Sequence, residues 1–252
     1  MTLFCVPNEV EVTPFAKEPT VTVRAVSQNP FGIPISVENP FGSPASGITE
    51  ALKEILELTG SSKIGLPEPQ VGYRLDYLIK FIESKYVPVH TKEFFSLTHS
   101  GKWDLIYSSS LAPKADDRLS FAVDQIIIPD ESHTHGTICN RIHWRLKQEQ
   151  DDACGILEVD CTYKLSPKGA MQVSIKEHVL SPDVFPNMPG LTIDKSCEIL
   201  LELIQVSVPY ESFDPDDTTI STSFLDPATR VSRVLGQKYP NVINVFKRIS
   251  EI

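Results

Sequence analysis

The segment that decides the fold reads Gly101-Lys102-Trp103-Asp104-Leu105-Ile106-Tyr107-Ser108-Ser109. Within it, Trp103, Leu105 and Tyr107 alternate with polar or smaller residues, and this period of two predicts a strand with one face turned inward. Gly101 stands at the start, where a residue without a side chain lets the backbone turn sharply or pass close to another element. The chain before this segment has the pattern of helices and a tail, whereas most of the chain after it alternates like strands.

Further alternating runs follow at regular intervals. They cover residues 137–146, 157–165 and 171–179, and each places mostly apolar side chains on one face and polar ones on the other. The turn Ser166-Pro167-Lys168-Gly169 separates the last two runs and predicts a hairpin. Such alternation is typical of an antiparallel sheet with one face in water, and several strands in series favour a closed barrel or a sandwich. We expect residues 100–252 to form an antiparallel β-barrel.

Two amphipathic stretches precede the predicted strands. The first covers residues 48–56, with Gly60 as a stop signal, and the second runs over residues 71–86 and ends at Pro88. Residues 47–99 are therefore expected to form a helical lead-in, with two helices packed as a hairpin on the barrel.

Two later segments carry weaker signals. The run of residues 197–206 fits either a buried strand or a helix, and its continuation through Val208 to Pro209 favours a strand. Residues 182–190 hold three prolines and a glycine, which predicts a loop long enough to act as a flap over a barrel mouth.

The first 46 residues are rich in proline. Proline fixes φ and removes a backbone donor, so this arm is expected to be extended rather than a continuous helix or a central strand. One motif repeats in it, as Asn29-Pro30-Phe31-Gly32 and ten residues later as Asn39-Pro40-Phe41-Gly42. Two interpretations stay open: Phe31 and Phe41 anchor the arm to a partner surface, or the arm folds back on its own domain.

The composition excludes several classes of protein. A net charge of -10 argues against sequence-independent nucleic-acid binding, which needs clustered Lys and Arg. No apolar run approaches the length of a membrane-spanning helix, so any membrane contact is expected to be peripheral. The five cysteines show no Cys-x-x-Cys spacing and are expected to be reduced, with Cys154 and Cys161 on opposite faces of one strand. The N-terminus has neither a secretory signal pattern nor the composition of a transit peptide.

Catalytic motifs are not found in the sequence. It holds no Gly-x-Ser-x-Gly elbow, no His-Glu-x-x-His and no phosphate-binding glycine loop. His133 and His135 lack a second ligand cluster, and Cys139 and Cys161 read as buried structural thiols, so we expect no metal site and no enzyme. The polar face of the run 137–146 fits either a solvated barrel exterior or a docking face for an acidic partner, and it carries Arg141, His143 and Arg145.

The C-terminal end carries a second signal for the fold. It reads Ser223-Phe224-Leu225-Asp226-Pro227-Ala228-Thr229-Arg230-Val231-Ser232-Arg233, which predicts an aromatic strand, an Asp turn and a strand with two arginines. We expect Arg230 and Arg233 to meet Trp103 at one pole of the barrel, where a guanidinium can stack on the indole. A strand opened by Gly-x-Trp is typical of lipocalin-like barrels, in which the indole closes the narrow end.

Together the two segments resemble the plastid lipid-associated proteins, also called fibrillins. That family has a helical lead-in, a Gly-x-Trp-x-Leu-x-Tyr-Thr-Ser strand and a Leu-Asp-x-x-Leu-Arg-Ile-Ser-Arg segment. The matching residues are Gly101, Trp103, Ile106, Tyr107 and Ser109 in the first motif and Leu225, Asp226, Arg230, Val231, Ser232 and Arg233 in the second. The chain departs from the family pattern at Ser108 and Thr229, by the insertion of residues 234–240 and by the arm of residues 1–46.

The resemblance implies a mainly β protein: a lipocalin-like antiparallel β-barrel preceded by an α-helical hairpin and an extended proline-rich arm. It implies a plastid protein, stromal or thylakoid-associated, that binds a hydrophobic small molecule such as a lipid, a carotenoid or a quinone. The expected ligand-binding residues, which can equally just fill the core, are Trp103, Tyr107, Trp144, Leu157, Val159, Tyr163, Val173, Ile175, Phe224, Arg230 and Arg233. The alternative is a peripheral structural subunit of a photosynthetic membrane complex, tethered by residues 1–46 and with a filled barrel.

Overall fold

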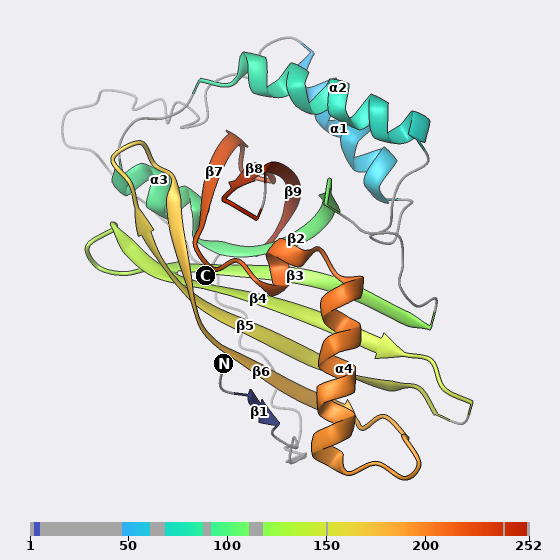
Figure 1. The fold of residues 1–252 in the computed structure, drawn as a ribbon. Coiled ribbons are helices and arrows are strands. Elements are labelled where there is room, and N and C mark those ends of the chain that lie inside the picture. Colours follow the sequence, from blue (N-terminus) through green and yellow to red (C-terminus); the bar gives the residue numbers. More distant parts are fainter. Residues whose placement is uncertain are drawn as a thin grey trace, which may run out of the picture.

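Eight antiparallel strands close into a barrel in the computed structural model, which describes residues 3–5, 47–60, 69–87, 92–110, 118–149, 151–238 and 240–250 (Figure 1). The strands are β2 (Gly101–Ser108), β3 (Leu119–Pro129), β4 (His135–Leu146), β5 (Ala153–Leu165), β6 (Met171–Val184), β7 (Thr218–Leu225), β8 (Thr229–Leu235) and β9 (Pro240–Ser250). Their order around the ring is β6-β5-β4-β3-β2-β9-β8-β7, and a short pairing of β6 with β7 closes it. The predicted barrel is confirmed.

A ninth strand lies outside the ring. β1 (Leu3–Cys5) pairs in parallel with the second half of β6, opposite residues 178–180. The predicted anchors of the arm, Phe31 and Phe41, lie outside the described residues.

Side chains along the long strands alternate between the barrel interior and its surface. On β5 the buried residues are every second one, so Cys161 is buried whereas Cys154 is half-buried, as their spacing predicts. The hairpin between β5 and β6 is also confirmed: the Ser166 amide donates to the Ala170 carbonyl, and Gly169 adopts a positive φ of 78°. The result is one continuous core inside the barrel.

In the described part of the chain, three helices precede the barrel: α1 (Ile48–Gly60), α2 (Pro69–Lys85) and α3 (Lys92–His99). The first two form the predicted hairpin, which lies above β7, β8 and β9 in Figure 1. Their apolar faces carry Ile55 and Ile79 and pack on side chains that leave the barrel outward, among them Val231 and Val245. This second core lies outside the barrel wall, so the wall is buried on both faces here.

The run of residues 197–206 is a helix, and the expectation of a strand is wrong. It belongs to α4 (Ile193–Ser207), which is followed by the short α5 (Tyr210–Phe213). The Thr192 side chain caps the helix by accepting from the Lys195 amide at 3.3 Å. Cys197, Leu200 and Ile204 lie on one helical face and join the barrel core, which explains why a run of apolar residues suited both readings.

The predicted loop of residues 182–190 begins inside the sheet, because β6 extends to Val184 before the chain turns towards α4. Gln148 on the β4–β5 side holds this loop through two hydrogen bonds to the Asn187 backbone, at 3.0 and 3.2 Å. Among the described residues, no helix has both the length and the apolar composition needed to cross a bilayer.

Candidate functional site

Trp103 lies at the start of β2 and is fully buried. Its indole Nε1 donates to the carbonyl oxygen of His99, the last residue of α3, at 2.9 Å. The guanidinium carbon of Arg230 lies 5.0 Å from the centre of the indole, and that of Arg248 lies 4.1 Å from it. The predicted meeting of Trp103 with Arg230 is therefore confirmed, whereas Arg248 was not foreseen as a partner.

Arg230 is a buried cation held mainly by aromatic rings. It lies 4.2 Å from the centre of the Phe246 ring, and its Nη2 donates to the Gln125 Oε1, while Nε and Nη1 have no partner among the described residues. Burial, together with the nearby Arg248 guanidinium, lowers the pKa of Arg230 to about 9. Gln125 in turn donates to the Asn140 Oδ1 at 2.9 Å. Arg230, Gln125 and Asn140 thus form a buried chain of hydrogen bonds.

Arg233 does not reach Trp103, and this part of the prediction is wrong. Residues three apart in a strand point to opposite faces, so Arg233 leaves the barrel where Arg230 enters it. Its guanidinium binds the Glu83 carboxylate of α2 at 2.6 and 2.9 Å and also donates to Asn241. Arg233 therefore ties the helical hairpin to the barrel.

Tyr107 and Phe224 also lie outside the barrel rather than in its interior. A register shift between Leu105 and Tyr107 reverses the alternation of β2, and a second shift just before Phe224 does the same in β7. Both side chains pack in the outer core beneath α1 and α2, where the Phe224 ring lies 5.4 Å from the Tyr86 ring.

The other predicted interior residues do line the barrel, and they fill it. Those that are buried in one core are Trp144, Leu157, Val159, Tyr163 and Val173, and Ile175 packs against them while half-buried. A void of only about 10 Å³ lies among Gln125, Asn140, Glu211 and Asn244, which is room for about one water molecule. Among the described residues, buried side chains therefore occupy the barrel interior around this void.

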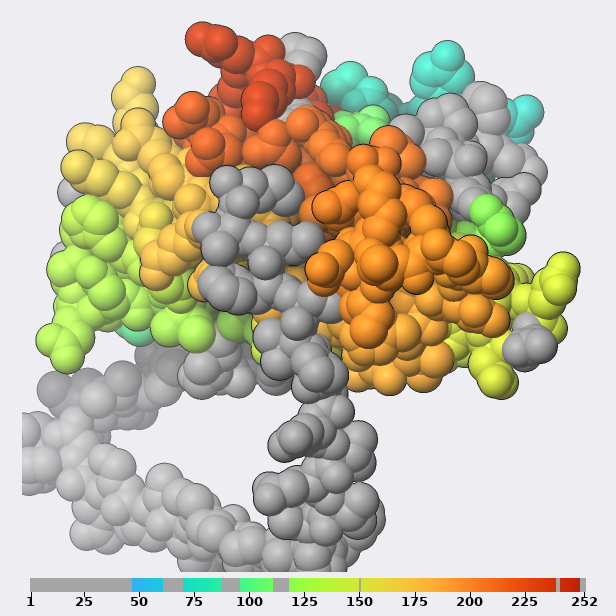
Figure 2. Space-filling model, turned by 60° about the horizontal axis from the view of Figure 1, so that its bottom comes forward, coloured from blue at the N-terminus to red at the C-terminus, as the bar shows by residue number. Residues whose placement is uncertain are grey.

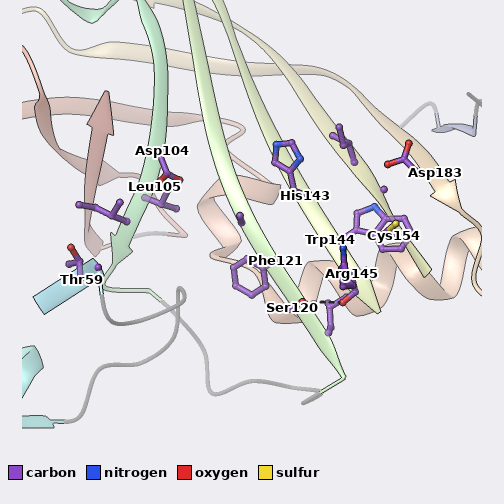
Figure 3. A pocket seen from close by; sticks show the side chains of 16 residues that line it. Thr59, Asp104, Leu105, Ser120, Phe121, His143, Trp144, Arg145, Cys154 and Asp183 are labelled. Carbon is purple, nitrogen blue, oxygen red and sulfur yellow. Dashed lines mark hydrogen bonds between the residues drawn. The ribbon is translucent and has the colours of Figure 1, made fainter. Parts of the chain in front are cut away.

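A much larger cavity opens through the barrel wall between β2 and β3. The two strands pair only from Gly101–Ile127 to Asp104–Asp124, after which β2 continues along β9 while β3 continues along β4. The resulting cleft has a volume of about 650 Å³ and is open to solvent. Figure 3 shows Leu105 and Thr59 on one side of it, with Phe121 and Trp144 across the gap.

The cleft combines an apolar floor with a polar rim. The half-buried Phe121 and the exposed Ala122 supply apolar surface above the buried Leu105, Leu119 and Trp144. The polar residues of the lining are Asp104, His143, Arg145, Cys154 and Asp183. The Nε1 of Trp144 has no partner in the described part of the chain, but this nitrogen is buried and does not face the open cleft.

The charged groups next to the cleft are linked to one another. The Asp124 carboxylate, on the outer face of β3, pairs with Lys102 at 2.7 Å and with His143 at 3.0 Å. Burial and the Asp124 charge raise the pKa of the Asp104 carboxyl, which favours its neutral form. Arg141 binds Glu158 at 2.7 Å, so the polar face of β4 is a set of ion pairs on the barrel exterior.

The other residues considered as metal ligands or nucleophiles are two histidines, His133 and His135, and two cysteines, Cys139 and Cys161. His133 faces the Ser96 hydroxyl at 3.4 Å and His135 faces that of Thr134 at 2.9 Å. In the described ranges, no three metal-ligating side chains of His, Cys, Asp or Glu come together. Burial raises the pKa of Cys161 to about 12 and that of Cys139 further still, so both thiols stay protonated and are poor nucleophiles.

Neither the protein-family models nor the curated proteins compared with this chain give a match. The geometry of the cleft and of the Trp103 pole therefore carries the functional argument. The sequence pattern missed the cleft because its lining comes from both faces of the sheet, which alternation assigns to separate surroundings.

Proposed function

We propose that this protein binds a hydrophobic small molecule without catalysing a reaction, and that the ligand occupies the cleft between β2 and β3. The observation that carries the proposal is the cleft itself: it measures about 650 Å³, and the half-buried Phe121 lies in its lining. Small-molecule sites commonly measure 300–1,000 Å³ and combine apolar walls with a few polar groups.

The resemblance of the two motifs to fibrillins supports a more specific version of this proposal. The ligand is then a lipid, a carotenoid or a quinone, and the protein works in a plastid, in the stroma or at the thylakoid membrane. Trp103 and Arg230 are part of the matched motifs, but they belong to a closed pole of the barrel. In this proposal they hold the barrel shut, and the ligand lies at its side.

Titration with the apolar dye Nile red tests the cleft as the binding site. Ala122 is exposed on β3 and lines the cleft, so Ala122→Trp should occupy part of the cleft and weaken the rise in dye fluorescence. Ile128→Trp is the matched control, because Ile128 is an exposed position on the same strand away from the cleft. Equal dye binding by the two variants would contradict the proposal.

A second readout uses the thiol of Cys154, which lines the cleft and is half-buried. Dye or natural ligand should slow its alkylation by iodoacetamide, measured for each cysteine by mass spectrometry. Organic extraction of the purified protein should also release a pigment or lipid.

The filled interior favours a second candidate, a structural subunit of a photosynthetic membrane complex. Among the described residues, buried side chains occupy the barrel, and the void beside Gln125 and Asn140 has room for about one water. If residues 1–46 tether such a subunit, their deletion should abolish its co-sedimentation with thylakoid complexes. Unchanged co-sedimentation would exclude this role.

A further inference from the structure

A row of charged side chains crosses the outer face of the barrel at the level where β2 and β3 part. Residues that lie directly opposite one another in neighbouring strands, from β9 to β5, are Lys247, Asp104, Asp124, Arg141 and Glu158. Opposite residues share a face of the sheet, with their Cβ atoms about 4.5–5.5 Å apart. The neighbours in this row carry opposite charges except where Asp104 meets Asp124.

The pair of like charges coincides with the end of a strand pairing. The pairing of β2 with β3, which we call the seam, starts at Gly101–Ile127 and ends at Asp104–Asp124. Like charges directly opposite each other destabilise a strand pair. Asp104 also lines the cleft, and Figure 3 shows it next to Leu105 on the β2 side of the gap. The residue that weakens the last pair of the seam therefore stands at the mouth of the cleft.

The two carboxylates of this pair have different surroundings. Asp124 binds Lys102 at 2.7 Å and His143 at 3.0 Å, whereas Asp104 forms no ion pair with any residue that the structure describes. The charged groups that act on Asp104 come from four strands: Lys102 of β2, Asp124 of β3, His143 of β4 and Lys247 of β9. Burial and the Asp124 charge outweigh the cations and raise the pKa of Asp104.

The seam is a place where the barrel wall can give way. By contrast, β3 pairs with β4 along its whole length. The pairing of β6 with β7 is also short, but α4 and α5 pack beside it: His178 Nε2 of β6 lies 2.8 Å from the Phe213 carbonyl oxygen of α5. Figure 2 shows the orange surface of α4 on the near face of the molecule. The seam instead borders an open cleft.

We propose that Asp104 is a proton-sensitive latch that sets the width of the cleft. In its neutral form, Asp104 donates a hydrogen bond to Asp124 and holds the last pair of the seam together. In its carboxylate form, it repels Asp124, the seam loosens and the cleft widens. This inference rests on the proposed function, because it assigns a means of regulation to the same cleft.

The direction of the pH effect follows from linkage. When the seam parts, Asp104 gains contact with water and moves away from Asp124, so its pKa falls towards the ordinary value. The parted state then binds fewer protons at Asp104 than the closed state does. A rise in pH through the titration of Asp104 must therefore favour the parted state.

Amide hydrogen exchange of the full chain without any ligand tests the latch. The protection of residues 101–104 and 124–127 is measured between about pH 4 and pH 8, with each rate corrected for its intrinsic pH dependence. Wild-type protection should fall by about two- to fivefold as Asp104 ionises, which is the size expected for one like-charge pair. The step should have the same midpoint as the titration of the Asp104 carboxyl carbon followed by NMR.

Asp104→Asn keeps the shape of the side chain but stays neutral, so its protection should remain high, without the step. Glu131→Gln is the matched control, because it removes the same charge from the exposed turn between β3 and β4, and it should keep the wild-type step. His143 is present in all three proteins, so a step that persists in Asp104→Asn comes from another group and would overturn the proposal. Constant wild-type protection across the range would do the same.

Nile red binding separates the latch from the proposed function. Asp104→Asn should bind the dye more weakly than wild type at neutral pH, because its cleft stays narrow. If wild type binds the dye but shows no step in protection, the latch fails alone. If the step is present and the dye does not bind, the cleft fails as the ligand site while the latch stands.

Discussion

The guanidinium of Arg230 on β8 and the indole of Trp103 on β2 stack 5.0 Å apart inside the barrel, with the Phe246 ring 4.2 Å from the same cation. No carboxylate among the described residues pairs with Arg230, so aromatic faces and the Gln125 amide are the groups that stabilise the charge. The pole is therefore held by packing around a cation rather than by an ion pair.

This relationship predicts different outcomes for two substitutions of Arg230. Arg230→Ala should lower the free energy of unfolding by about 3 kcal/mol, because it leaves a cavity in the core. Arg230→Met should change it by less than about 1 kcal/mol, since it fills the space and removes the cost of burying a charge. Urea unfolding followed by tryptophan fluorescence measures both, and equal losses would show that the charge itself stabilises the pole.

The ion pair between Arg233 and Glu83 predicts a coupling between the barrel and the helical hairpin. Both side chains are largely buried, so a double-mutant cycle with Arg233→Met and Glu83→Gln should give a coupling free energy of about 1–2 kcal/mol. The control cycle uses Lys53 and Glu57 on α1, an exposed pair at 3.7 Å, where no measurable coupling is expected. A coupling no larger than that of the control would contradict the role of Arg233 as a tie.

Gly155 predicts a steric limit beside the cleft. A Cβ at this position would lie 2.4 Å from the Ser181 carbonyl oxygen and 2.8 Å from Cζ2 of Trp144, so Gly155→Ala should cost about 2 kcal/mol or more. Gly60→Ala at the end of α1 is the matched control, because no atom lies within 4 Å of its added Cβ. Thermal unfolding should rank the control at or above wild type, and a harmless Gly155→Ala would contradict the close packing of β5 on β6.

Tyr163 predicts a loss of stability at alkaline pH. Burial raises the pKa of Tyr163 to about 12 from 10.0, so an unfolded chain loses this proton before the folded one does. The unfolded state then binds fewer protons between these values, and stability falls as the pH rises through this window. Wild type should lose about 2 kcal/mol more than Tyr163→Phe across it.

The measurement is urea unfolding at a series of pH values. Tyr73→Phe removes an exposed phenol and serves as the control, which should follow wild type. If the free energy of unfolding fell equally with pH for wild type and Tyr163→Phe, that result would contradict the buried, protonated state of Tyr163.

The barrel, its helical hairpin and the contact of Trp103 with Arg230 could be predicted from the sequence, because alternation with period two and helical spacing are local signals. The positions of Tyr107 and Phe224 could not. A strand that gains one residue at a register shift exchanges its faces, and no residue type marks the shift in β2 or β7.

The α4 helix and the partner of Arg233 escaped prediction for other reasons. A run rich in Leu, Ile and Val satisfies both a buried strand and a helix that is buried on one side, and only tertiary packing decides between them. The pairing of Arg233 with Glu83 and the stacking of Arg248 on Trp103 join residues far apart in the chain. The residues next to Arg233 and Arg248 in the sequence do not indicate which distant side chain each arginine contacts.

Because the pairing of β2 with β3 ends at Asp104–Asp124, the barrel has an opening in its side. A ligand bound in this opening could enter and leave without breaking the backbone hydrogen bonds between strands. β2 stays paired with β9, and β3 stays paired with β4. Exchange of such a ligand would therefore not require the barrel to unfold.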